Sequence, residues 1–198
     1  MAIVNTKIKQ KTIKKEVSLN GVGLHTGKEV IMTFKPASEN FGFKFKRSDL
    51  EGEPVIEADA NYVTNTQRGT CLEKNGVTIQ TCEHVLAALV GLDIDNVLIE
   101  LNASEPPIMD GSSKFFIEAI EKAEIVEQDK TRKEYVITNV ISYTDEESGS
   151  EILVMPSKEY QVTTMVDFGT KVLGTQNATL KHMSDFKNEI SDSRTFSF

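Results

Sequence analysis

The spacing of apolar residues changes near residue 81, and this change constrains the fold more than any other feature of the sequence. Before it, apolar and polar residues alternate as in strands with one buried face, in residues 12–19, 29–34 and 43–45. After it, four apolar residues recur at the spacing of one helical face: Cys82, Val85, Leu86 and Leu89. The change of periodicity predicts that strands are followed by at least one helix.

Local signals predict where these elements begin and end. Asn75-Gly76 separates two short apolar runs and is a strong signal for a two-residue hairpin turn. Thr81 is a candidate N-cap for the first helix, and Gly91 is a candidate stop. A strand over residues 96–101 and a second helix, from Ser112 or Ser113 to about Ala123, complete the pattern. The predicted order is therefore several strands, a helix, a strand and a second helix. The second helix is expected to turn three apolar residues inward: Phe116, Ile117 and Ile120.

A wholly polar stretch at residues 127–133 suggests a boundary between two domains. We predict a first α+β domain over residues 1–128 and the start of a second, similar one over residues 134–198. Strand patterns resume in the second part, at residues 135–143, 152–155 and 160–166, and a short helix capped by Ser184 is expected at residues 185–190. The second domain thus holds only its opening strands.

Composition excludes several classes of function. The net charge is −8, and the only dense basic stretch, residues 7–15, alternates with other residues like the outer face of a strand. Nucleic-acid binding is therefore not expected. No apolar run approaches the roughly 20 residues that span a bilayer, and no secretory signal is visible, so we expect a cytoplasmic protein. Cys71 and Cys82 form no paired motif and are expected to be reduced thiols.

Glu83-His84 is the pair most suggestive of chemistry. The side chains of adjacent helical residues point about 100° apart. If His84 binds a metal, Glu83 could therefore lie beside the metal without coordinating it. A metal-assisted hydrolase needs such a ligand and such a carboxylate, which takes a proton from water. The alternative is a solvated acid and a partly buried polar residue in the first turn of a helix. A catalytic zinc usually has three protein ligands, and no His-Glu-x-x-His motif is present.

Other polar residues leave both structural and functional readings open. His25 lies in a segment with three glycines in seven residues, and it is either a loop histidine bonded to backbone or a side chain presented into a cleft. His182 and Asp185 are rejected as a zinc site, since they occupy a polar segment with no third partner nearby. Asp110 is interpreted as a turn and cap residue. Thr195 lies either in an alternating strand or at the lip of an apolar groove.

Five motifs, taken together and in this order, resemble those of the LpxC family of UDP-3-O-acyl-N-acetylglucosamine deacetylases of Gram-negative bacteria. They are Gly21-Val22-Gly23-Leu24-His25-Thr26-Gly27, Thr81-Cys82-Glu83-His84-Val85-Leu86-Ala87-Ala88-Leu89, Ile94-Asp95-Asn96, Pro107-Ile108-Met109-Asp110-Gly111-Ser112 and Arg194-Thr195-Phe196. The resemblance extends from about residue 11 to residue 198.

The resemblance implies two similar α+β domains, each with two layers in which a sheet packs on two helices, and the helices of both domains facing each other around the active site. It also implies one zinc ion and the removal of acetate from a UDP-linked, 3-O-acylated glucosamine on the route to lipid A. It implies that His84 is a zinc ligand and Glu83 the general base, while Thr195 hydrogen-bonds the oxyanion of the tetrahedral intermediate. It further implies that five residues contact the substrate: Leu24, His25, Phe168, Phe196 and Phe198.

The sequence also departs from the family pattern. The family's other zinc ligands, a substrate-binding lysine and a general acid would all follow residue 198, and His182 matches none of them. We therefore expect the 198 residues alone to be inactive. The second domain would also lack its helices, so we expect its sheet to expose an apolar face and open edges. The chain is then expected either to associate with itself or to pack this sheet against the first domain. The competing hypothesis is a non-catalytic binding or scaffold protein of similar fold, in which Glu83 and His84 are merely structural.

Overall fold

The computed structural model describes residues 2–195, which belong to two compact units. Among these residues, the helical unit comprises 9–130 and 184–195, and the hairpin unit comprises 2–8 and 131–183. Each unit combines segments that are distant in sequence. Residues 184–195 belong to the helical unit. The sequence pattern had assigned them to a second domain that starts at residue 134.

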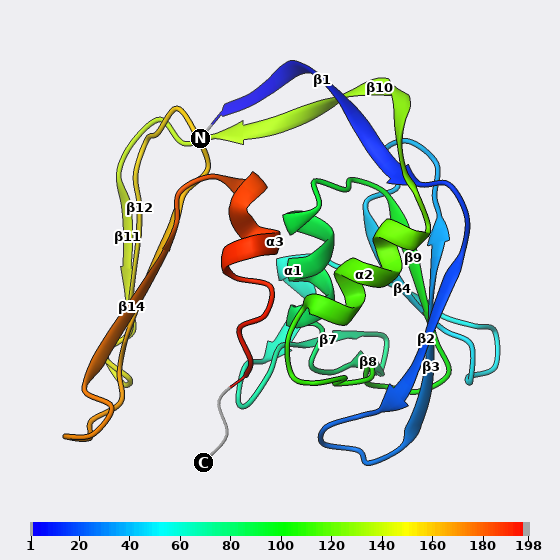
Figure 1. Cartoon of the computed structure of the whole chain (residues 1–198), viewed down its shortest axis with the longest axis horizontal. Helices are drawn as coiled ribbons and strands as arrows, with labels where there is room; N and C mark the ends of the chain where they lie inside the picture. The colour runs from blue at the N-terminus through cyan, green and yellow to red at the C-terminus, as the bar shows by residue number, and fades with distance from the viewer. Residues whose placement is uncertain (1, 196–198) are drawn as a thin grey trace. The chain divides into compact units, whose positions relative to one another are not determined.

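A five-stranded mixed sheet forms one layer of the helical unit (Figure 1). Its strands, in spatial order, are β2 (Val17–Val22), β3 (Glu29–Pro36), β9 (Val97–Leu101), β4 (Phe43–Arg47) and β5 (Val55–Glu57). Neighbouring strands are antiparallel except β4 and β9, which run parallel with Phe45 opposite Ile99. The expected α+β class is confirmed.

One face of this sheet is buried and the other is polar, which follows from the period of two along a strand. In β3, Val30, Met32 and Phe34 are buried, whereas Lys35 on the outer face pairs with Glu100 at 2.9 Å. Figure 1 shows α1 (Glu83–Gly91) and α2 (Lys114–Lys122) on the same side of the sheet. The three apolar residues predicted to face inward from the second helix are all buried, with at most 2% exposure: Phe116, Ile117 and Ile120.

A smaller sheet joins β6 (Val63–Asn65), β7 (Cys71–Lys74) and β8 (Val77–Ile79), and a 3₁₀ turn, η1 (Ala60–Tyr62), precedes it. The predicted hairpin turn is confirmed, since Lys74 pairs with Val77 across two loop residues. Asn75 and Gly76 both have positive φ, 53° and 77°, as a type I′ turn requires. This sheet lies next to the start of α1 in the chain and supplies part of the site described below.

The polar stretch at residues 127–133, predicted to mark a domain boundary, belongs to a strand. β10 (Ile125–Val136) runs through residues 127–133 and pairs with β1 (Ala2–Ile13) in a two-stranded sheet. Most side chains of both strands are exposed, so neither shows the alternation that marks a strand with one buried face. The strand predicted over residues 12–19 is also interrupted, because β1 ends at Ile13 and β2 begins at Val17.

The predicted N-cap of the first helix is wrong. The N-cap of α1 is Cys82, not Thr81, because the Thr81 hydroxyl donates instead to the Glu105 carboxylate at 2.9 Å. Ser113 does occupy the N-cap position of α2, but its hydroxyl donates to the His84 carbonyl. α1 ends at Gly91, the predicted stop.

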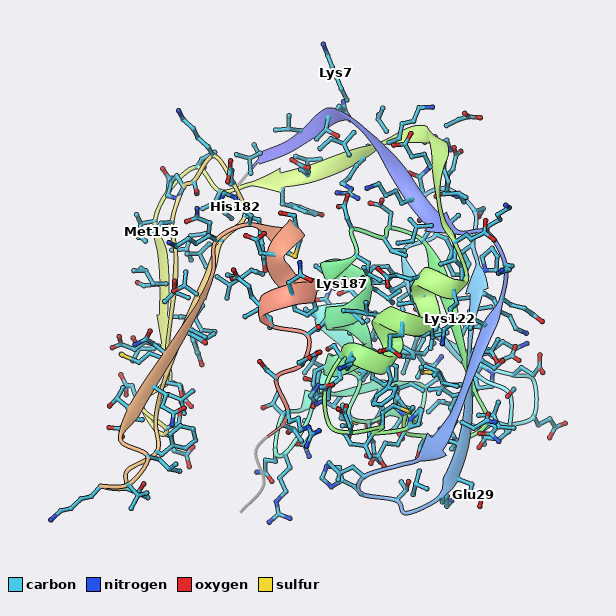
Figure 2. All side chains as sticks on the ribbon, viewed as in Figure 1. Lys7, Glu29, Lys122, Met155, His182 and Lys187 are labelled. Atoms are coloured by element: carbon cyan, nitrogen blue, oxygen red, sulfur yellow. The ribbon has the colours of Figure 1, made fainter. Side chains whose placement is uncertain are left out.

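The segment after residue 183 packs in the helical unit through a short helix, α3 (Phe186–Glu189), which follows the 3₁₀ turn η2 (Met183–Asp185). Asp185 rather than Ser184 is its N-cap. Phe186 is 8% exposed, and its ring lies against Gly91 so closely that a Cβ there would come within 2.1 Å of Cδ1. Lys187, labelled in Figure 2, pairs with Glu121 of α2.

The hairpin unit contains β11 (Ile141–Thr144) paired with β12 (Glu151–Val154), and β13 (Val162–Asp167) paired with β14 (Thr175–Leu180). The sequence did not predict β14. Many apolar side chains of this unit are exposed, including Tyr135, Tyr143, Ile152, Met165 and Met155, the last labelled in Figure 2. Across residues 2–195, no helix is long and apolar enough to cross a lipid bilayer.

Candidate active site

Glu83 is the first residue of α1, where a negative charge is favoured by the helix dipole. Its Oε2 accepts a hydrogen bond from the Thr70 backbone N–H at 2.9 Å, which ties the carboxylate to the segment before β7. Gly69 borders the other oxygen, since a Cβ at Gly69 would lie 3.4 Å from Glu83 Oε1. The hydrogen bond to Oε2 thus orients the half-buried carboxylate, and Oε1 takes no part in that bond.

His84 is half-buried in the same helical turn. Its carbonyl accepts from the Ser113 hydroxyl at 3.0 Å, so the first turn of α1 is linked to the start of α2. In the part of the chain that the structure describes, no hydrogen bond or ion pair engages the His84 imidazole. The side chain is therefore available to bind a ligand while its backbone is fixed by α2.

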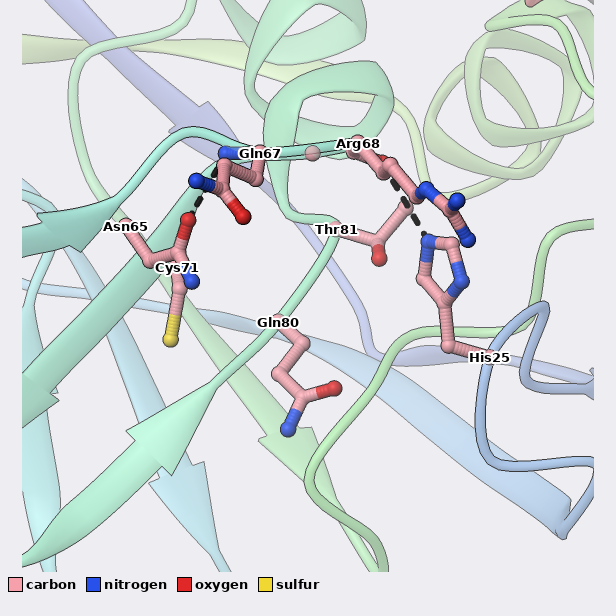
Figure 3. Close-up of a pocket in the computed structure, with 8 residues that line it drawn as sticks. His25, Asn65, Gln67, Arg68, Cys71, Gln80 and Thr81 are labelled. Carbon is pink, nitrogen blue, oxygen red and sulfur yellow. Dashed lines mark hydrogen bonds between the residues drawn. The ribbon is translucent and has the colours of Figure 1, made fainter.

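His25 is presented from the glycine-rich loop that follows β2. Its Nε2 lies 3.2 Å from the Arg68 carbonyl oxygen, as the dashed line in Figure 3 shows. The two residues border a pocket of about 190 Å³ that opens beside the start of α1. The pocket is lined mainly by polar residues: His25, Asn65, Gln67, Arg68, Gly69, Cys71, Gln80 and Thr81.

Thr195 is brought to the loop that precedes α2. Its N–H donates to the Gly111 carbonyl at 2.8 Å, and Arg194 lies 3.6 Å from the Asp110 carboxylate. Burial raises the pKa of Asp110, but hydrogen bonds from Ser112 and the charge of Arg194 outweigh it, so the net pKa lies below its usual value. Asp110 is therefore an ionised turn residue, consistent with its interpretation from sequence.

The buried thiol beside Glu83 is inert. Burial, with a smaller contribution from the Glu83 charge, raises the pKa of Cys82 to about 12. A thiol must ionise to act as a nucleophile or a metal ligand. Cys82 is therefore a small core residue, and both cysteines are free of disulfides.

The other residues predicted to contact the substrate lie in several separate parts of the chain. Leu24 is exposed beside His25 in the glycine loop. Phe168 belongs to the hairpin unit, where its N–H donates to the Gly174 carbonyl at 3.1 Å. Phe196 and Phe198 lie outside the described residues. His182, labelled in Figure 2, is also in the hairpin unit. Its Nδ1 lies 2.8 Å from the Glu159 carboxylate.

Sequence reasoning missed two residues of this region, Arg68 and Glu105. Arg68 has a positive φ of 63° and directly precedes Gly69. It lines the pocket together with His25, whose imidazole contacts the Arg68 carbonyl. Glu105 is completely buried and accepts hydrogen bonds from the glycine loop and from Thr81. Neither position carries a local signal, because the partners of each come from distant parts of the chain.

The described residues do not by themselves fit a catalytic zinc ion. Within residues 2–195, no group of three His, Cys, Asp or Glu side chains could hold a metal. A catalytic zinc needs about three protein ligands, and His84 offers one. Any zinc site that uses His84 thus requires ligands from elsewhere.

Comparison with known proteins identifies the family. The family model described as LpxC, UDP-3-O-acyl N-acetylglycosamine deacetylase, matches residues 10–198. The chain belongs to the LpxC family. Its LpxC relatives include a bifunctional enzyme LpxC/FabZ of Bacteroides thetaiotaomicron, 46% identical over 191 residues, which cover 96% of this chain and 41% of the relative. A second bifunctional enzyme LpxC/FabZ, from Porphyromonas gingivalis, is 45% identical over 190 residues, again 96% of this chain and 41% of the relative.

A relative that is named only as a deacetylase is similar as well. The UDP-3-O-acyl-N-acetylglucosamine deacetylase of Chromohalobacter salexigens is 40% identical over 194 residues, which cover 96% of this chain and 63% of that protein. The chain thus spans about two fifths of its bifunctional LpxC relatives and somewhat less than two thirds of this deacetylase. The region shared with LpxC proteins includes Glu83, His84, His25 and Thr195.

Proposed function

We propose that this chain supplies part of the active site of a zinc-dependent deacetylase in lipid A biosynthesis. The enzyme would remove acetate from the 2-acetamido group of UDP-3-O-acyl-N-acetylglucosamine. The observation that carries the proposal is the first turn of α1 in a chain of the LpxC family, where Glu83 is oriented by the Thr70 N–H and His84 stands beside it. A scaffold protein has no need for this arrangement.

The proposal gives each residue a step in amide hydrolysis. The Glu83 carboxylate takes a proton from the water that attacks the amide carbon, and the Thr70 N–H holds that carboxylate in place. The amide oxygen becomes an oxyanion, to which the Thr195 hydroxyl donates a hydrogen bond. The bond from Thr195 N to the Gly111 carbonyl fixes the backbone of this donor.

Zinc is proposed as the cofactor of the longer protein, with His84 as one ligand. When bound, such an ion polarises the substrate carbonyl and lowers the pKa of water. Because the described residues supply no complete set of ligands, we propose that the other ligands lie outside these 198 residues. The same reasoning leads us to propose that this chain alone does not turn over substrate.

Substrate binding is assigned to the residues around the pocket and to aromatic residues elsewhere in the chain. Leu24 and His25 would form part of the wall of the site, and their exposure in the glycine loop supports that role. Phe168 would pack on the uracil ring, and Phe196 and Phe198 would line the passage for the sugar and the acyl chain. Two free thiols suit a reducing compartment and support a cytoplasmic location.

We also propose that this chain associates with itself through the hairpin unit. The exposed apolar side chains of that unit, among them Tyr135, Tyr143 and Met165, support this proposal.

Acetate release from UDP-3-O-acyl-N-acetylglucosamine tests the proposed function directly. The assay compares the 198-residue chain with a protein that carries it at the full length of its deacetylase relatives. We expect zinc-dependent release by the longer protein and none by the 198 residues. Turnover by the short chain would contradict the proposed division of the site, and no turnover by the longer protein would contradict the activity itself.

A further inference from the structure

Glu105 is a buried carboxylate for which the proposed chemistry has no use. Its side chain is 0% exposed, yet it lies in the loop between β9 and α2, where polar residues are usually solvated. An ionised group at such a position is stable only when hydrogen bonds replace its lost hydration. The identity of those donors shows what the carboxylate holds in place.

Two of the donors are consecutive backbone amides of the glycine loop. The His25 N–H lies 3.1 Å from each Glu105 oxygen, and the Thr26 N–H donates to Oε2 at 3.0 Å. The Thr26 hydroxyl donates to the same oxygen at 3.0 Å. The carboxylate thus fixes the backbone on both sides of the His25 side chain, which reaches the Arg68 carbonyl at the pocket.

Gly23 shows how closely the loop wraps around this carboxylate. A Cβ at Gly23 would lie 2.4 Å from Thr26 Oγ1 and 2.6 Å from Glu105 Oε2, well inside normal contact distance. Gly23 lacks a positive φ, so the glycine is required here by close approach and not by backbone conformation. The glycine-rich segment is therefore shaped to fit the buried acid.

The remaining donor connects Glu105 to the start of α1. Thr81 donates its hydroxyl to Glu105 Oε1 at 2.9 Å and has a positive φ of 52°. This conformation is rare and costly for a β-branched residue, and it persists only where surrounding contacts impose it. Thr81 directly precedes Cys82, the N-cap of the helix that begins with Glu83 and His84. One carboxylate therefore holds both segments that carry the candidate catalytic and binding residues.

We infer that Glu105 is a positioning residue, which locks the His25 loop to the start of α1 so that both border the pocket in a fixed relation. The ionised form suits this role, because a carboxylate accepts all of these donors at once. Burial raises the pKa of Glu105, but the hydrogen bonds from Thr26, His25 and Thr81 outweigh burial and leave the pKa below its usual value. The link to deacetylation rests on the proposed function, whereas the link between Glu105 and the loop does not.

Amide hydrogen exchange in the 198-residue chain tests this inference, with Glu105→Gln as the variant. The amide group has the same shape but keeps only one acceptor oxygen, so some N–H and O–H donors lose their partner. We expect the His25 and Thr26 amides to exchange about 10- to 100-fold faster, as the loss of a hydrogen bond to a charged group predicts. Core amides such as those of Phe34 and Ile99 are expected to keep their rates.

The control is Glu73→Gln, which replaces an exposed carboxylate on β7 and should leave all these rates unchanged. Unchanged exchange at His25 and Thr26 in Glu105→Gln would overturn the inference. A uniform acceleration, or failure to fold, would also overturn it, since Glu105 would then provide global stability. In the longer protein we expect Glu105→Gln to raise KM more than it lowers kcat. Absence of any deacetylase activity there would contradict the proposed function but leave the exchange result standing.

Discussion

Glu83→Gln is expected to lower the kcat of the longer protein about 100- to 10,000-fold, the usual contribution of a general base. The glutamine Oε1 can still accept the hydrogen bond that the Thr70 N–H now gives to Glu83. The variant therefore keeps the local geometry and loses only the ability to take a proton. Steady-state acetate release measures kcat, and thermal unfolding shows that the fold is retained.

The matched control for this experiment is again Glu73→Gln, an exposed carboxylate on the neighbouring strand β7. It removes the same charge near the same sheet, and we expect kcat to change less than about twofold, since surface substitutions away from special features have small effects. If Glu83→Gln retained most of the activity while folding normally, Glu83 would not be the base.

Gly91→Ala is expected to destabilise the helical unit by about 2 kcal/mol, although alanine favours a helix over glycine by up to about 1 kcal/mol. The added Cβ would lie 2.1 Å from Phe186 Cδ1 and 2.6 Å from Cε1, so the ring must leave its position. Phe186 is 8% exposed and anchors α3. Just after this helix, the Ser191 carbonyl accepts a hydrogen bond from the Ser113 N–H at 3.0 Å. Chemical denaturation measures the change.

The same substitution should loosen the segment that carries Thr195. We expect the amide of Thr195, now bonded to the Gly111 carbonyl, to exchange faster in Gly91→Ala. Val90→Ala, an exposed change one residue earlier in α1, is the control and should affect neither stability nor Thr195 appreciably. Combining Gly91→Ala with Phe186→Leu should recover part of the loss, because the two positions are in contact. A stabilised Gly91→Ala would contradict this packing.

The sequence predicted those elements whose signals are local. The hairpin at Asn75-Gly76 follows from a turn that few other residue pairs can form, and α2 follows from the spacing of Phe116, Ile117 and Ile120. β10 was missed because most of its side chains are exposed, so burial imposes no period on its sequence. β14, exposed along most of its length, was missed for the same reason.

The site could be predicted only where neighbours in sequence are neighbours in space. Glu83 and His84 were found because they share one helical turn and resemble a family motif. Glu105 could not be found, since its donors lie 24 and about 80 residues away in the chain. The wrong cap at Thr81 has the same cause: a long-range bond to Glu105 took the hydroxyl that local rules assign to the helix.

Zinc titration by calorimetry tests the central claim most directly, because it asks whether His84 belongs to a metal site that these 198 residues leave incomplete. The 198-residue chain is titrated beside the longer protein and its His84→Ala variant. We predict tight binding of one zinc ion by the longer protein only, and loss of that binding in His84→Ala. Equally tight binding by the 198-residue chain would contradict the account, since His25 or His182 would then have to complete a site within it.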